Sequence, residues 1–164
     1  MAKWSANCQA ITPIAVADAT NFTSGGFLAL QGGSSTQVIR VSDILIMGQA
    51  AASAPTPMVL ARDSTVGATL SGGYLAAYDP ATAALAAPMV QFTTATTKPQ
   101  RSSTLQLLQI PFNAYGGLVR IGQAENWEWG MLGNTASFGE LSLSCANTTG
   151  TPGLLTITIG FEPE

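Results

Sequence analysis

The residues that come nearest to a catalytic pair are Glu125 and Glu128, which flank Trp127 in the segment AENWEWG (124–130). Two carboxyl groups are sufficient for glycoside hydrolysis, where one is the acid and the other the base or nucleophile. In a strand, however, residues three apart point to opposite faces of the sheet. The spacing therefore predicts two solvent-facing carboxylates rather than a converging pair.

Histidine is absent from the 164 residues, which excludes Ser-His-Asp and Cys-His nucleophilic catalysis. Zinc and haem sites lose their commonest ligand for the same reason. No G-x-x-x-x-G-K-[ST] or G-x-G-x-x-G motif is present. Asp43, Asp63 and Asp79 are isolated, which is typical of aspartates in turns. The sequence predicts a protein that is not an enzyme and that binds no cofactor and no metal.

The aromatic residues give two alternatives. Trp127 and Trp129 are two residues apart and therefore share one face of a strand. Such a face predicts a core or a subunit interface; the alternative is a platform on which sugars stack, with Tyr115 as a further contact. Trp4, close to the N-terminus, either covers the core or reaches into a neighbouring subunit.

Charged residues make up only 9% of the chain, against roughly 25% in ordinary domains. The six Lys and Arg residues are scattered, and the net charge is −3, which argues against nucleic acid as a partner.

The run ILIMGQAAASA from Ile44 is too short for a membrane span, which needs about 20 apolar residues. The first ten residues contain no apolar signal region, so we expect synthesis in a cytosol, or export by a route that the sequence does not show. In a cytosol Cys8 and Cys145 are expected as buried thiols; a disulfide between paired terminal strands is the alternative.

Alternation of apolar and polar residues is the dominant pattern and predicts strands separated by Gly, Ser, Asn and Pro turns. The predicted strands are 3–9, 36–48, 58–64, 88–94, 103–112, 116–122, 125–132, 136–144 and 153–161. Residues 78–89 are expected to contain at most one short helical turn. The pattern favours an all-β fold, an antiparallel β-sandwich or jelly roll of about eight strands.

One domain over residues 1–164 accounts for the length, with residues 1–12 as a candidate N-terminal arm that contacts other subunits. Within 36–48, strict alternation places two sets on opposite faces: Ile39, Val41, Leu45 and Met47 on one, and Arg40, Ser42, Ile44 and Ile46 on the other. The second face changes from polar to apolar, as expected of a strand that enters a core or an interface. Ile44 and Ile46 are therefore candidate contact residues.

Four segments carry a resemblance to a known family: MAKWSANCQAI at the start, GGLVRIGQAENWEWGMLG, FGELSLS, and LLTITIGFEPE at the end. With these segments the chain resembles capsid decoration (cement) proteins of tailed bacteriophages of the β-sandwich or jelly-roll type. The resemblance implies a symmetric oligomer, with a trimer favoured, that sits on the lattice of the major capsid protein at the virion surface. It implies no catalytic residues. Trp4, Ile44, Ile46, Trp127 and Trp129 are then the expected oligomer or capsid contacts.

Overall fold

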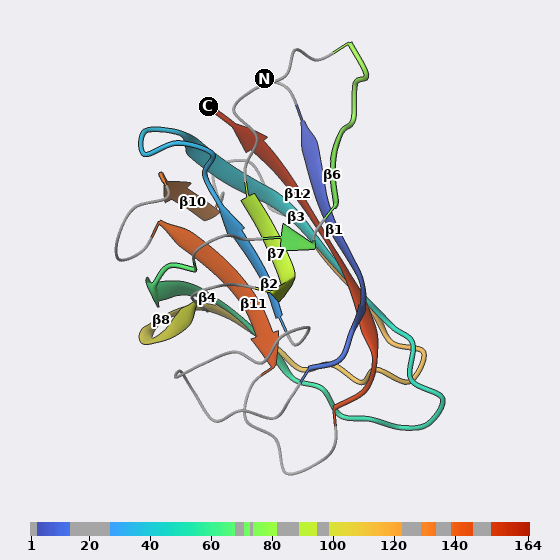
Figure 1. The fold of residues 1–164 in the computed structure, drawn as a ribbon. Coiled ribbons are helices and arrows are strands. Elements are labelled where there is room, and N and C mark those ends of the chain that lie inside the picture. Colours follow the sequence, from blue (N-terminus) through green and yellow to red (C-terminus); the bar gives the residue numbers. More distant parts are fainter. Residues whose placement is uncertain are drawn as a thin grey trace.

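The computed structural model describes residues 3–13, 27–67, 71–72, 74–81, 89–94, 99–122, 129–133, 139–145 and 152–164. Within these ranges the chain forms twelve β-strands and no helix (Figure 1). The strands are β1 (Trp4–Ile11), β2 (Phe27–Gln31), β3 (Val38–Gly48), β4 (Met58–Thr65), β5 (Ser71–Gly72), β6 (Tyr74–Ala77), β7 (Met89–Thr94), β8 (Gln100–Ile110), β9 (Leu118–Gly122), β10 (Trp129–Leu132), β11 (Glu140–Cys145) and β12 (Leu155–Pro163).

The strands form two antiparallel sheets of six. Sheet A has the order β6-β1-β12-β3, and both β9 and β10 pair with the remaining edge of β3. Sheet B has the order β5-β7-β2-β11-β4-β8. The expected all-β antiparallel sandwich is confirmed.

The pairing of the strands is that of a jelly roll. β1 pairs with β12, β2 with β11, β3 with β9, and β4 with β8, so the first half of the chain folds back on the second half. The resulting sheets, β1-β12-β3-β9 and β2-β11-β4-β8, contain the eight strands of that architecture. Four further strands extend the sheets: β5, β6 and β7 between β4 and β8 in the chain, and β10 between β9 and β11.

A bulge in β3 corrects the predicted faces of this strand. Val41 pairs with Phe161 and Asp43 with Gly160, so Ser42 is an extra residue without a partner on β12. The extra residue shifts the alternation by one position. Ile44 and Ile46 consequently join the core and are fully buried. Of the two alternatives for this face, the core is therefore correct, and the prediction that Ile44 and Ile46 are oligomer or capsid contacts is wrong.

The segment predicted as an N-terminal arm is an inner strand over residues 4–11. β1 pairs on one side with β12 and on the other with β6. Ala6 and Cys8 are completely buried in the core, and Trp4 packs against it. Trp4–Ile11 is therefore part of the sandwich and is not free to extend to a neighbour.

The core lies between the sheets, but sheet B is also buried on its other face. Core-facing residues of sheet B include Leu28, Leu30, Leu60, Leu141 and Leu143. The opposite face carries Ala29, Gln31, Ala61, Ser142 and Ser144, each no more than 1% exposed. Sheet A differs, because its outer face carries the exposed ion pairs of Lys3, Arg40 and Arg120.

Small residues allow close approach of the backbone at one end of the sandwich. A Cβ at Gly48 would lie 2.2 Å from the carbonyl oxygen of Ala114, which is a clash with backbone. The same two segments are joined by the hydrogen bond from Ala50 N to Ala114 O at 3.0 Å. Glycine at position 48 is therefore required for this contact.

The two cysteines are free thiols, as expected. Burial raises the pKa of Cys8 to about 12 and that of Cys145 to about 11.

The segment 78–89, where at most one short helical turn was predicted, is described only in part. Asp79–Ala81 forms a turn, and residues 82–88 lie outside the described part of the chain. The described residues include no helix long and apolar enough to cross a membrane.

Candidate functional site

A hollow of about 430 Å³ opens on the outer face of sheet A. It is lined by Lys3, Ser42, Asp43, Tyr78, Arg120, Gly122, Gly160 and Phe161. These residues come from β3, β9 and β12 and from the segments that flank β1 and β6. The jelly-roll pairing thus brings together five parts of the chain that are far apart in sequence.

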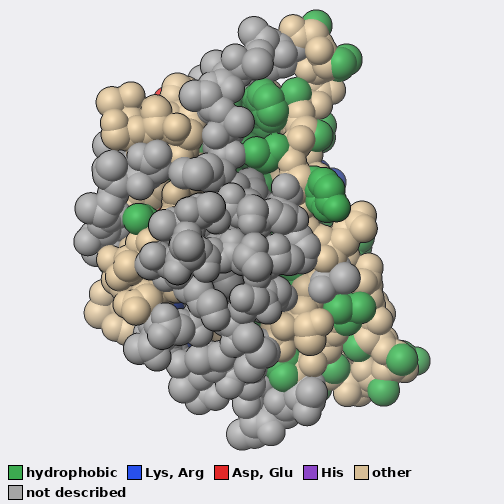
Figure 2. Space-filling model, in the orientation of Figure 1, with side chains coloured by type: hydrophobic (Ala, Val, Ile, Leu, Met, Phe, Trp, Pro, Cys, Tyr) green, Lys and Arg blue, Asp and Glu red, His purple; other side chains and the backbone are tan. Residues whose placement is uncertain are grey.

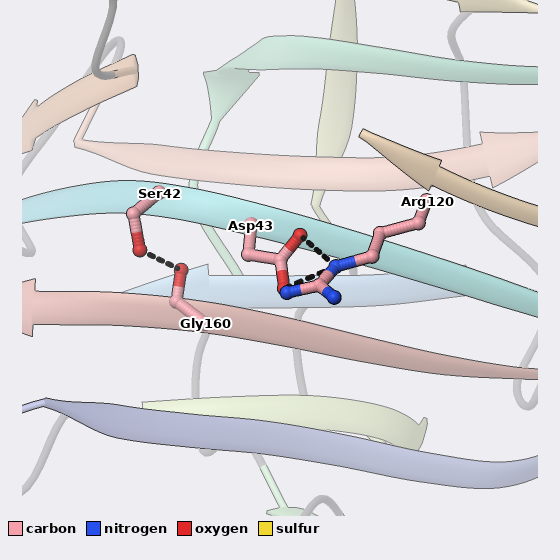
Figure 3. Close-up of polar contacts among 4 residues, drawn as sticks. All are labelled: Ser42, Asp43, Arg120 and Gly160. Carbon is pink, nitrogen blue, oxygen red and sulfur yellow. Dashed lines mark hydrogen bonds and ion pairs between the residues drawn. The ribbon is translucent and has the colours of Figure 1, made fainter. Parts of the chain in front are cut away.

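The bulge in β3 forms one side of this hollow. Ser42 and Asp43 together oppose Gly160 of β12, so two polar side chains lie beside a residue with no side chain. The Ser42 hydroxyl donates a hydrogen bond to the Gly160 carbonyl at 3.4 Å (Figure 3). Bulges are frequent next to binding sites because they re-aim side chains, and here the bulge keeps Asp43 out of the core.

Two ion pairs border the hollow. The Arg120 Nε lies 3.3 and 3.2 Å from the two oxygens of Asp43, and its Nη2 lies 3.1 Å from Oδ2 (Figure 3). The hydrogen bond to Asp43 and the charge of that carboxylate raise the pKa of Arg120. Lys3 Nζ lies 3.4 Å from Oε1 of Glu162. Two cations and two carboxylates leave the border of the hollow electrically neutral overall.

Tyr78 provides an aromatic wall. Its backbone N–H donates to the Lys3 carbonyl at 2.9 Å, which fixes the residue beside β1. The residue is 62% exposed, so the ring remains accessible. In Figure 2, hydrophobic side chains gather along the edge of the molecule where β6 runs, and few charged side chains show on this face.

A second polar cluster is buried within sheet B and involves Asp63 and Glu140. Leu141 of β11 opposes Arg62 of β4, and this register places Glu140 beside Asp63. Both residues are fully buried, and their carboxyl groups lie close enough to influence each other's ionisation. Asp63 lies in the predicted strand 58–64, but the expectation that it is isolated is wrong, because a second acid lies beside it.

Other polar groups surround this carboxyl pair. Glu140 Oε2 accepts hydrogen bonds from the Gln31 side-chain amide and from the Gly67 backbone N–H, the latter at 2.8 Å. The Ser142 hydroxyl donates to Asp63 Oδ1 at 2.5 Å. Arg101, which is 3% exposed, donates to the Ser144 hydroxyl at 2.8 Å. The cluster is closed to solvent and acts as a polar support within the sheet.

Burial raises the pKa of both acids, and the neighbouring charge of Glu140 adds to the increase for Asp63. Hydrogen bonds from Gln31 and Gly67 oppose the increase for Glu140. The hydrogen bond from Ser142 and the charge of Arg101 oppose the increase for Asp63. Both pKa values stay raised because two adjacent buried carboxyls cannot both ionise cheaply.

This arrangement makes stability decrease with rising pH. The native state retains protons that the unfolded chain has released above the ordinary values of 3.8 and 4.5. The stability that these retained protons add is complete below the ordinary pKa values. It is lost as pH rises through the raised pKa values of the native state. We expect the melting temperature to fall as pH rises above the ordinary pKa values of the two carboxyl groups. Asp63→Asn, whose amide can replace the protonated carboxyl, should flatten that dependence; a melting temperature that rises equally in both proteins would contradict the raised pKa values.

No family model matches this sequence, and no curated protein matches it either. The site must therefore be interpreted from its own geometry. Among the described residues, no three His, Cys, Asp or Glu side chains gather where they could hold a metal ion.

Of the predicted aromatic contacts, the structure places Trp129 and Tyr115 far apart. Trp129 is half-buried, packs against the core and pairs with Val41 near one end of β3. Tyr115, 59% exposed, follows Ala114 beside the other end of that strand. Seven residues of strand separate these ends by roughly 23 Å. Trp127, Glu125 and Glu128 lie outside the described residues.

Proposed function

We propose that this protein is a non-enzymatic structural protein of a phage virion. In this proposal it binds the lattice of the major capsid protein as a symmetric oligomer, with a trimer favoured, and stabilises the head. The observation that carries the proposal is the jelly-roll pairing, an architecture that recurs in viral capsid domains. The residue types support it: a histidine-free chain with 9% charged residues incurs little desolvation cost when its surface is covered by another subunit.

The candidate contact surface is the edge of sheet A at β6. Among the described residues this strand pairs with β1 alone, so its other side offers backbone N–H and C=O groups. Tyr74 on β6 is 66% exposed. An edge strand with an exposed tyrosine suits pairing with a second subunit, and it takes the place of Ile44 and Ile46 as the contact.

The alternative, a carbohydrate-binding module that uses Trp127, Trp129 and Tyr115, has less support. A stacking platform needs rings that are exposed and adjacent. Trp129 packs against the core, and Tyr115 lies beside the opposite end of β3.

Native mass across a hundredfold dilution tests the proposal, measured by size-exclusion chromatography with light scattering. We expect a mass about three times the 16.8 kDa chain that resists dilution, as in an obligate symmetric oligomer. Tyr74→Asp should weaken this oligomer, because it places a charge at the β6 edge. Ser103→Asp, which adds the same charge at an exposed position of β8 in sheet B, is the matched control. A monomer at every concentration would contradict the proposal.

If the oligomer is found, sedimentation with expanded empty heads tests the second half of the proposal. Co-sedimentation that saturates at a fixed ratio to the major capsid protein is the expected result. Equal recovery of the protein with and without heads would contradict capsid binding.

A further inference from the structure

The hollow at the β3 bulge combines three kinds of group in one place. Asp43 is 28% exposed at its side chain and offers a carboxylate oxygen as acceptor. Arg120 and Lys3, with side chains 71% and 64% exposed, offer donors. Tyr78 adds an accessible ring. Acceptor, donors and a ring around one small volume match the polar and apolar groups of a sugar.

We propose that this hollow binds a neutral pyranose unit of a glycan. One ring hydroxyl donates to Asp43, and a neighbouring hydroxyl oxygen accepts from Arg120 or Lys3. The Tyr78 ring packs against the C–H face of the sugar. This inference goes beyond the structural role proposed above and does not depend on it.

The charges favour a neutral ligand over an anion. Each cation at the hollow is already paired with a carboxylate: Arg120 with Asp43 and Lys3 with Glu162. A phosphate or carboxylate ligand would lie beside the partly exposed Asp43 and be repelled by it. A hydroxyl group, by contrast, both donates and accepts and can use the ion pair as it stands.

Two glycines keep the hollow open. Gly122 and Gly160 line it from β9 and β12, and neither has a positive φ that would require glycine. A Cβ at Gly122 would meet no atom within 4 Å, so packing does not exclude a side chain there. Glycine within a strand lowers stability, and it often marks a place where a ligand or another backbone comes close. At Gly160, a Cβ would lie 3.3 Å from the Asp43 Cβ and 3.7 Å from the Tyr78 hydroxyl, inside the site.

The probes are glucose, galactose, mannose and N-acetylglucosamine, with inorganic phosphate as the anionic comparison. Each is titrated into ¹⁵N-labelled full-length protein while amide shifts are recorded. We extend the titration to roughly 50 mM, because a small ligand in an open site binds with a Kd of about 1 mM or weaker. We expect at least one hexose to shift the amides of Asp43, Gly122 and Gly160 saturably.

Two variants locate the binding. Gly122→Leu fills the hollow and leaves all its polar groups in place, and it should abolish the shifts. Asp43→Asn should weaken binding roughly tenfold, because it removes a charged acceptor. Tyr115→Ala, an exposed tyrosine at the other end of β3, is the matched control for a general loss of exposed aromatic surface and should bind as the wild type does.

Several results would overturn the inference. One is no saturable shift with any of the four sugars; others are saturable binding of phosphate in place of the sugars, and sugar binding that survives Gly122→Leu. Loss of binding in Tyr115→Ala would place the sugar elsewhere and overturn it as well. Unchanged native mass in Gly122→Leu shows that a loss of sugar binding is separate from any failure of oligomer formation.

Discussion

Replacing Glu140 by alanine is expected to lower the free energy of unfolding by about 3–5 kcal/mol. Glu140 is fully buried, and its Oε2 accepts hydrogen bonds from Gln31 and Gly67. The substitution removes the acceptor of the Gly67 N–H and one of the two acceptors of the Gln31 amide, which keeps the Gly67 carbonyl. It also leaves a cavity where the buried side chain was. A buried polar group that loses its partner costs about 1–3 kcal/mol.

Urea unfolding followed by circular dichroism measures this loss. Glu164→Ala is the matched control, because Glu164 is also an acid with hydrogen-bond partners but lies exposed at the surface, paired with Arg40. The exposed pair should contribute no more than about 1 kcal/mol. If Glu140→Ala lost no more stability than Glu164→Ala, the carboxyl cluster could not be the buried support that the structure shows.

The importance of Glu140 was not visible in the sequence. In ASFGELSLS, Glu140, Ser142 and Ser144 alternate with leucines, and this pattern normally predicts a polar, solvent-facing side. The structure buries that side too, because β11 is a central strand of a sheet covered on both faces. Asp63 and Glu140 meet only because β4 and β11 are neighbours. Strand order depends on tertiary packing, so local periodicity could not show this pair.

Where the large apolar residues of a strand keep to alternate positions, the pattern is sufficient. In the predicted strand 153–161, alternation places Leu155, Ile157, Ile159 and Phe161 on one face, and all four lie in the core. The sequence does not predict β2, because FLALQ shows no clear alternation of apolar and polar residues. Both faces of this strand are buried: Ala29 and Gln31 are as buried as Leu28 and Leu30. β6 was missed because four residues between turns are too short for a periodic signal.

The hollow could have been located from one irregularity. Ile39 and Val41 are two residues apart, as are Ile44 and Ile46, but three positions separate Val41 from Ile44. A shift of this kind within a strand indicates a bulge, and the polar pair Ser42-Asp43 stands at the shift. The contributions of Lys3, Tyr78 and Arg120 could not be predicted, because they depend on which strands flank β3 and β12.

The bulge in β3 also explains a second large effect on stability. Ile46→Ala is expected to lower the free energy of unfolding by about 2–5 kcal/mol. Ile46 is fully buried, lies in the core cluster, and has Ile157 and Val119 as its neighbours in register on β12 and β9. Truncation removes buried methyl groups and leaves a cavity between the two sheets. Urea unfolding measures the loss.

Leu45→Ala is the matched control, because it truncates the adjacent residue on the other face of β3. Leu45 is half-buried on the outer face, so its truncation should cost well under half as much. Strict alternation without a bulge predicts the reverse order, with Leu45 in the core and Ile46 at an outer contact. The ranking of the two variants therefore tests the bulge itself. If Ile46→Ala kept wild-type stability but dissociated the oligomer, then Ile46 would be a contact residue, and the hollow built on the bulge would lose its geometric basis.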